Sequence, residues 1–115
     1  WLVGLLMLHQ HWGSIASEAV YPGITRQTVQ GELQTVVRYI YQPGAVFPMH
    51  AHPQEQITLV LSGTIAFTIG DAIVELGAGD VAVIPANVPH GARVTGTEIV
   101  ESFNTLSPAR TVQPG

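Results

Sequence analysis

The sequence contains no cysteine, and lysine and arginine together account for only 4 of its 115 residues. Without cysteine there is no disulfide framework and no thiolate zinc site, so a bound metal would need imidazole, carboxyl or amide ligands. The formal net charge of -4 and the scarcity of cations argue against a basic patch for phosphates or an anionic membrane surface. We therefore expect neither nucleic acid nor a membrane as a partner.

Charged residues are also scarce, at 10% of the chain, whereas 46% of the residues are hydrophobic and the sequence has 12 glycines and 8 prolines. Disordered chains have the opposite balance, with few apolar and many charged residues. The length suits one domain, because a single hydrophobic core commonly serves about 100–150 residues. These features predict one globular domain that is rich in strands and turns.

Short β-branched or alternating runs, separated by Gly, Pro, Asn and Asp, predict an all-β fold of short strands. Gly70-Asp71 is typical of a tight hairpin, and Gly77–Asp80 is typical of the turn that follows it. Antiparallel neighbours of this kind suit a jelly-roll β-barrel around a central cavity. The predicted strands are Thr25–Val29, Leu33–Tyr41, Gln56–Leu61, Thr64–Ile69, Ala72–Leu76, Val81–Ile84, Gly91–Val94 and Thr97–Phe103.

The chain starts with an apolar run, Trp1–Leu8, that no Lys or Arg precedes. This run is far shorter than the roughly 20 residues that a membrane-spanning helix needs, and a truncated signal peptide is the weaker interpretation. We expect residues 1–19 to pack against the barrel or against a second subunit. The apolar surface that they offer predicts a homodimer, and we expect a cytoplasmic protein.

Three histidines and a glutamine stand at spacings that suggest one metal site. His50 and His52 point to the same side of an extended segment, because side chains two residues apart share a face. Gln56 opens the next predicted strand, and His90 follows the proline-rich loop Pro85–Pro89. Imidazoles and an amide oxygen can hold one divalent transition metal ion, for which Ni, Zn, Mn and Fe are the candidates. In the alternative, Gln56 only forms a hydrogen bond and the site has three histidines.

The same residues carry a resemblance to a known family. Gly44-x5-His50-x-His52-x3-Gln56-x6-Gly63 resembles the first motif of the cupins, in which Glu usually stands at the glutamine position. The resemblance implies a cupin jelly-roll domain over residues 20–110, followed by a C-terminal tail at residues 111–115. It also implies that His50, His52, Gln56 and His90 bind the metal.

The second cupin motif is matched by Gly79-x5-Pro85-x-Asn87-x2-His90, with Asn87 in the place of a glycine and Val94 where the motif ends in Asn. Gln56 in the first motif would leave the metal with four uncharged ligands and its full positive charge. An anionic ligand would bind more strongly because of this charge. A high-valent metal needs anionic ligands, which this set lacks, and this argues against an oxidative dioxygenase.

Within the cupins, several stretches resemble the small KdgF-type proteins, which linearise 4,5-unsaturated monouronates released from pectin and alginate. That branch ends in D-x-F-S-P-x-R, whose Asp, Phe and Arg line the substrate pocket. Here Arg110 matches the Arg, whereas Asn104 replaces the Asp and Leu106 the Phe. The stretches are Gly23-Ile24-x-Arg26, His52-Pro53-x2-Gln56-Ile57-Thr58, Ile84-Pro85-x2-Val88-Pro89-His90-Gly91 and Ser107-Pro108-Ala109-Arg110.

The replacement of the Asp bears on chemistry, because an amide cannot act as a general base near neutral pH. We expect Arg110 to pair with a substrate carboxylate and Asn104 to bind a hydroxyl group, the alternative being an exposed Arg110. If the last strand is regular, Glu98 and not Glu101 shares a face with Asn104 and could supply the missing acid. Arg38 is either a second anion contact inside the barrel or a solvent-facing residue.

Three functions fit these observations. The first is a metal-dependent lyase or isomerase that acts on a small anionic, sugar-derived acid. The second is a ligand-binding or sensing cupin without catalytic activity, which the missing Asp and Phe favour. The third is an iron-dependent dioxygenase, which the uncharged ligand set disfavours.

Overall fold

The computed structural model describes residues 9–110, which form short strands and one 3-10 helix. Trp1–Leu8 and residues 111–115 lie outside the described residues, so the expectations for both ends of the chain stay predictions. The elements are η1 (Trp12–Ser14), β1 (Glu18–Tyr21), β2 (Ile24–Gln30), β3 (Thr35–Tyr41), β4 (Val46–His50), β5 (Glu55–Ser62), β6 (Ile65–Ile69), β7 (Ala72–Leu76), β8 (Val81–Ile84), β9 (His90–Val94) and β10 (Val100–Ser107).

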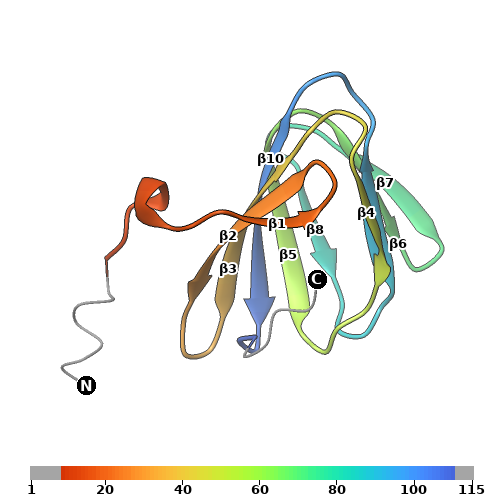
Figure 1. The fold of residues 1–115 in the computed structure, drawn as a ribbon. Helices are drawn as coiled ribbons and strands as arrows, with labels where there is room; N and C mark the ends of the chain where they lie inside the picture. Colours follow the sequence, from red (N-terminus) through yellow and green to blue (C-terminus); the bar gives the residue numbers. More distant parts are fainter. Residues whose placement is uncertain (1–8, 111–115) are drawn as a thin grey trace.

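The strands form two antiparallel sheets that face each other (Figure 1). The six-stranded sheet has the order β1-β2-β3-β10-β5-β8, and the four-stranded sheet has the order β4-β9-β6-β7. From β3 onward the chain crosses repeatedly between the two sheets, as it does in a jelly roll. The prediction of an all-β, single-domain jelly-roll fold is confirmed.

The space between the sheets holds the core and the candidate site. Burial alternates along both central strands, so that Val37, Tyr39 and Tyr41 of β3 and Asn104 and Leu106 of β10 are buried. This alternation follows from the pleat of a strand, which sends successive side chains to opposite faces. Polar side chains on the inner faces therefore mark a cavity within the barrel.

The η1 turn lies against the outer face of the six-stranded sheet (Figure 1). The Trp12 ring packs on Phe103 of β10, with ring centroids 5.3 Å apart. The Gln27 side-chain amide in β2 donates hydrogen bonds of 2.8 and 2.9 Å to the backbone oxygens of Trp12 and Ile15. This part of the chain before β1 thus packs on its own barrel.

Two strands, β1 and β4, are missing from the sequence prediction. Both lie at a sheet edge, and both have an irregular register with their partner strand. Pro48 lies within β4, where an edge position tolerates a residue that cannot donate a ladder hydrogen bond. Proline and a bulge both weaken the alternating pattern from which strands are predicted.

The predicted strand Thr97–Phe103 is wrong in its bounds, because β10 runs from Val100 to Ser107. Val100 pairs with Tyr41, the last residue of β3, so there is no partner strand for residues that precede Val100. The predicted strand Leu33–Tyr41 also starts too early, because β3 begins at Thr35. Leu33 is 76% exposed and lies in the turn before β3, which a hydrogen bond from Gly31 N to Gln34 O closes.

The predicted turns are confirmed at both sites. Gly70 has a φ of 57° in the β6–β7 hairpin, where Ile69 pairs with Ala72. Asp80 accepts a 2.8 Å hydrogen bond from Gly77 N in the next turn. Within residues 9–110, no helix has the length and hydropathy that crossing a bilayer would require. The cytoplasmic location and the homodimer stay predictions.

Candidate functional site

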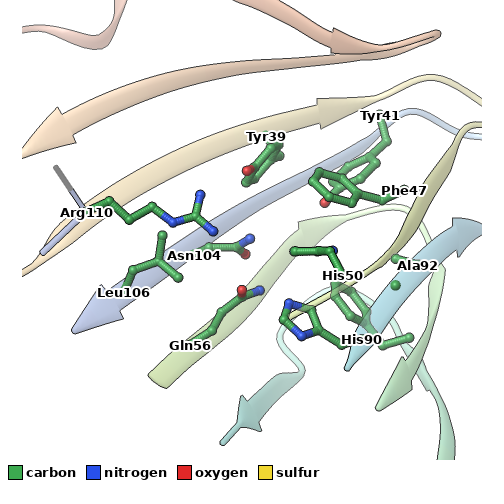
Figure 2. Close-up of a pocket in the computed structure, with 12 residues that line it drawn as sticks. Tyr39, Tyr41, Phe47, His50, Gln56, His90, Ala92, Asn104, Leu106 and Arg110 are labelled. Atoms are coloured by element: carbon green, nitrogen blue, oxygen red, sulfur yellow. The ribbon is translucent and has the colours of Figure 1, made fainter. Parts of the chain in front are cut away.

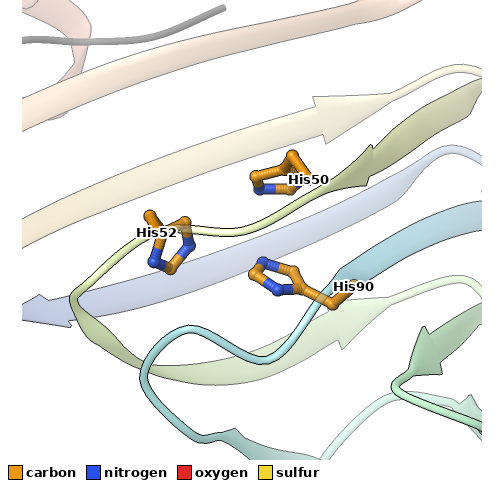
Figure 3. A group of neighbouring side chains, drawn as sticks. All are labelled: His50, His52 and His90. Carbon is orange, nitrogen blue, oxygen red and sulfur yellow. The ribbon is translucent and has the colours of Figure 1, made fainter.

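His50, His52 and His90 converge at one end of the barrel interior (Figure 3). His50 ends β4, and His52 follows in the loop. His90 begins the neighbouring strand β9, where it is paired with His50. One ring nitrogen of each histidine lies within 4.8 Å of those of the other two. The predicted convergence of these side chains is thus confirmed, although His52 lies in a loop and not in a strand.

The loop before His90 holds His52 in place. Asn87 N donates a 2.8 Å hydrogen bond to the backbone oxygen of His52. Asn87 has a φ of 65°, a left-handed conformation that Asn tolerates better than most residues other than glycine. This explains why Asn can stand where the second cupin motif has glycine.

Backbone carbonyls orient all three imidazoles. The Nδ1 atoms of His50, His52 and His90 lie 3.0, 3.0 and 2.9 Å from the backbone oxygens of Pro48, Gln54 and Val88. Because a carbonyl only accepts, each Nδ1 carries a hydrogen and the lone pair of the neutral ring is on Nε2. Fixed tautomers of this kind are typical of metal-binding histidines.

Burial keeps these rings uncharged. Desolvation lowers the pKa of His50 and of His52, and it lowers the pKa of His90 to about 4. The positive charge of Arg110 contributes to the lowered pKa of each ring. The three imidazoles are therefore neutral near pH 7, which is the state that binds a metal.

The buried Nε2 of His90 has no hydrogen-bond partner among the described residues. His52 Nε2 lies 3.1 Å from Gln56 Oε1, while the Gln56 side-chain nitrogen donates a 2.9 Å hydrogen bond to Thr58 Oγ1. A divalent cation among these atoms would satisfy lone pairs that otherwise lack a donor. The residues present therefore fit a metal ion, with the three histidines as its principal ligands.

A pocket extends from the histidines between the two sheets (Figure 2). The histidines and Gln56 lie at one end, and Arg110 and Leu106 lie toward the other, with Asn104 between them. The lining residues are Tyr39, Tyr41, Phe47, His50, Gln56, Phe67, His90, Gly91, Ala92, Asn104, Leu106 and Arg110. No carboxylate is among these described residues.

Arg110 lines the pocket and is only 5% exposed, which excludes the alternative of a solvent-facing side chain. Its backbone N donates a 2.9 Å hydrogen bond to Thr35 Oγ1, which fixes the end of the described chain on β3. Within residues 9–110, its buried Nε has no hydrogen-bond partner and no carboxylate lies within ion-pair distance of its guanidinium group. A buried cation in this state favours an anionic ligand.

Asn104 also points into the pocket, where its Oδ1 is buried and has no partner among the described residues. This oxygen can accept a hydrogen bond from a ligand hydroxyl group. The structure thus brings Asn104 and Arg110 together with the histidines, as the sequence predicted. Their roles toward a ligand stay predictions.

Glu98 does not share a face with Asn104, so this expectation is wrong: Glu98 lies in the exposed loop before β10. Glu101 is on the outer face of the sheet, where it pairs with Arg38 at 2.6 Å. Arg38 is therefore the outward-facing residue of the two alternatives and is not an anion contact in the barrel. Neither glutamate supplies an acid to the pocket.

Sequence reasoning assigned no role to Tyr39, which lines the pocket between Arg110 and the histidines (Figure 2). Tyr39 is directly opposite Arg26 on β2, and both side chains are buried. The alternation of β3 could have placed Tyr39 on the inner face. The approach of two arginines to it depends on strand pairing that the sequence does not specify.

The family model of the cupin domain matches residues 37–105, a range that includes the three histidines and Gln56. The chain therefore belongs to the cupin family. The fold and the histidine cluster were expected from the two motifs, and the match supports that interpretation.

Individual relatives share parts of the chain. It is 40% identical over 67 residues, or 57% of its length, to a Bacillus subtilis protein named H2HPP isomerase, of which it spans only 28%. An RmlC-like cupin from Shewanella frigidimarina is 27% identical with a TM-score of 0.83, covering 90% of this chain and 93% of that one. KdgF from Halomonas sp. is 26% identical with a TM-score of 0.75, covering 84% of this chain and 88% of that one.

Proposed function

We propose that this cupin is a metal-dependent lyase or isomerase that acts on a small anionic, sugar-derived acid. The observation that carries the proposal is the pocket itself, which extends from a three-histidine cluster to a buried guanidinium group that has no carboxylate partner among residues 9–110. A ligand that spans the pocket would place an oxygen near the histidines and a carboxylate at Arg110. Sugar acids of the uronate type have both groups.

The protein's own residues would bind and orient this ligand. His50, His52 and His90, with Gln56 as a fourth ligand, would hold one divalent ion, which polarises a carbonyl or hydroxyl oxygen when bound. Arg110 would pair with the carboxylate, and the free Oδ1 of Asn104 would accept a hydrogen bond from a hydroxyl group. Apolar side chains such as Phe47 and Phe67 would keep bulk water from the reacting atoms.

Two similarities support this chemistry. KdgF from Halomonas sp. has the same fold, and the sequence of this chain shares with the KdgF-type proteins the Gln at the metal position and the terminal Arg. The partial match to a protein named as an isomerase agrees with a rearrangement of atoms within one substrate.

A second function, a ligand-binding or sensing cupin, is favoured by one specific observation. Asn104 and Leu106 line the pocket where the KdgF-type proteins have Asp and Phe, and no described lining residue is a carboxylate. Such a pocket could bind a sugar acid without converting it.

The two functions are separated by incubating the metal-loaded protein with 4,5-unsaturated galacturonate or mannuronate. Loss of the alkene absorbance, measured against the spontaneous rate, reports conversion. The lyase or isomerase function predicts that the wild type exceeds this background and that His50→Ala does not. A sensing cupin would leave the substrate unchanged while the substrate still raises the melting temperature.

A further inference from the structure

Conversion of a uronate needs a group that can transfer a proton, and the pocket offers few. Asn104 cannot act as an acid or base near neutral pH, and Glu98 and Glu101 lie outside the pocket. Among the described lining residues other than the histidines, only Tyr39 and Tyr41 carry a group that releases a proton readily enough. The two tyrosines differ in their surroundings.

Tyr39 lies on the inner face of β3, opposite Arg26 of β2 and Ser102 of β10. The two cationic side chains beside it are Arg26, which is paired with it across β2 and β3, and Arg110, which lines the same pocket (Figure 2). All three side chains are buried. A phenol O–H can donate to a bound ligand while its oxygen accepts from a guanidinium group.

The two guanidinium groups also favour a negative charge on the same oxygen. Arg26 is anchored by Glu18, whose Oε1 lies 2.7 Å from Arg26 Nε, so its position is fixed from β1. Arg110 has no carboxylate within ion-pair distance in the described part of the chain. The charge that develops as a proton leaves Tyr39 would therefore meet prepositioned donors in a buried site.

Tyr41 lacks this arrangement. Its ring is buried, desolvation raises its pKa, and the residue paired with it on β2 is the apolar Ile24, where Tyr39 has Arg26. Loss of a proton from Tyr41 would leave a buried negative charge without a cationic donor.

We propose that Tyr39 is the proton-transfer residue of this pocket and a catalytic residue of the lyase or isomerase function, on which this inference rests. In a 4,5-unsaturated uronate, the hemiacetal hydroxyl loses its proton and becomes the aldehyde as the bond between the hemiacetal carbon and the ring oxygen breaks. The ring oxygen becomes a ketone oxygen, and the alkene electron pair takes the Tyr39 proton to form a C–H bond. The proton released by the hemiacetal hydroxyl returns to Tyr39, so the reaction consumes no second reactant.

The experiment compares the metal-loaded wild type with Tyr39→Phe and with Tyr21→Phe as a matched control. Tyr21 is a half-buried tyrosine that packs on Phe47 and does not line the pocket. Three quantities are measured for each protein. They are the rate of alkene loss with 4,5-unsaturated galacturonate, the metal content, and the rise in melting temperature with saturated galacturonate, which binds without reacting.

Tyr39→Phe is expected to lose a factor of roughly 10²–10⁴ in kcat, as general acid–base residues do, with metal content and galacturonate shift close to wild type. Tyr21→Phe is expected to keep all three values. Replacement of Tyr39 by the nearly isosteric 3-fluorotyrosine, which is more acidic, should move the alkaline limb of the pH–rate profile to lower pH, an effect that a positioning role would not produce.

The inference is overturned if Tyr39→Phe keeps the wild-type rate, which leaves the proposed function intact. It is also overturned if Tyr39→Phe loses the galacturonate shift together with the rate, because Tyr39 would then position Arg110 and not transfer a proton. A wild type that binds metal and galacturonate but does not convert the unsaturated substrate overturns the proposed function and the role of Tyr39 together.

Discussion

His52 Nε2 and Gln56 Oε1 lie 3.1 Å apart, although both atoms carry lone pairs. His52 Nδ1 donates to the backbone oxygen of Gln54, and the Gln56 nitrogen donates to Thr58 Oγ1, so neither side chain turns a hydrogen toward the other. Two acceptors at this distance need a cation between them or a rotated amide. The uncharged amide of Gln56 suits the site with and without a metal. Its oxygen can bind the metal, and after rotation its N–H can donate to the His52 imidazole when no metal is bound.

This relationship predicts that Gln56 contributes to metal affinity. Gln56→Leu should weaken binding by at least the roughly tenfold that loss of a supporting contact costs at metal sites. Gln56→Glu should strengthen binding of the divalent ion, because a carboxylate adds a negative charge, and should weaken binding of anions in the pocket. Isothermal titration with Ni²⁺ or Zn²⁺ measures the metal affinity of both variants.

The matched control is Gln54→Leu, which keeps the backbone oxygen that orients His52. It should titrate like the wild type. If Gln56→Leu also binds with wild-type affinity, the site uses the three histidines alone, as the alternative interpretation of the sequence holds.

The lowered pKa values of the histidines predict how the metal-free protein responds to acid. Their ordinary pKa is 6.5, and that of His90 is about 4 in the folded state, so the unfolded chain binds protons first as the pH falls. These groups leave the free energy of unfolding unchanged above about pH 6.5 and decrease it between about pH 6.5 and 4.

Urea titrations of the metal-free wild type and of His90→Asn over this pH range test the effect. The variant should lose less stability on acidification than the wild type. Parallel pH profiles for the two proteins would show that His90 is not buried in its neutral form.

Arg110 should govern the binding of anionic sugars. Galacturonate is expected to raise the melting temperature of the wild type, and Arg110→Gln should lose most of that shift, because a buried charged partner is removed. Arg38→Gln is the control, since Arg38 pairs with Glu101 on the outer face. Equal shifts in wild type and Arg110→Gln would place the anion elsewhere.

Position 104 should determine how fast the protein converts a uronate. Asn104→Asp adds a carboxylate at the pocket wall, and general acid–base assistance is worth roughly 10²–10⁴-fold, so the variant should convert 4,5-unsaturated galacturonate faster than the wild type. Thr105→Asp, the next residue of β10 and on its opposite face, is the control. A rate that stays at the spontaneous background in metal-loaded Asn104→Asp would favour the sensing function.

The fold was predictable because much of it is encoded in local patterns. The Gly70-Asp71 hairpin and strand β7 were predicted from residues that are close together in the sequence. The edge strands β1 and β4 were not, since bulges and Pro48 break their alternation. The start of β10 was also missed, because it depends on where β3 ends, far away in the chain.

The candidate metal centre was predictable for a similar reason. His50 and His52 are two residues apart, and His90 follows a loop that only a few backbone conformations suit, so their spacing carries the information. Tyr39 and Arg26 meet only through the pairing of β2 with β3, and Glu98 was misplaced because strand parity was extended beyond the end of a strand. Contacts that depend on register between strands are not readable from spacing alone.

The number of divalent metal ions bound per chain is the most direct test of the metal centre. Protein produced in medium supplemented with Ni, Zn, Mn and Fe is analysed by elemental mass spectrometry, and the metal-stripped protein is then titrated with each ion. A metal centre at the three histidines predicts about one ion per chain in the wild type and little in His50→Ala or His90→Ala, which remove ligands of the cluster. A wild type that is metal-free as purified and binds none of the four ions on titration would contradict it.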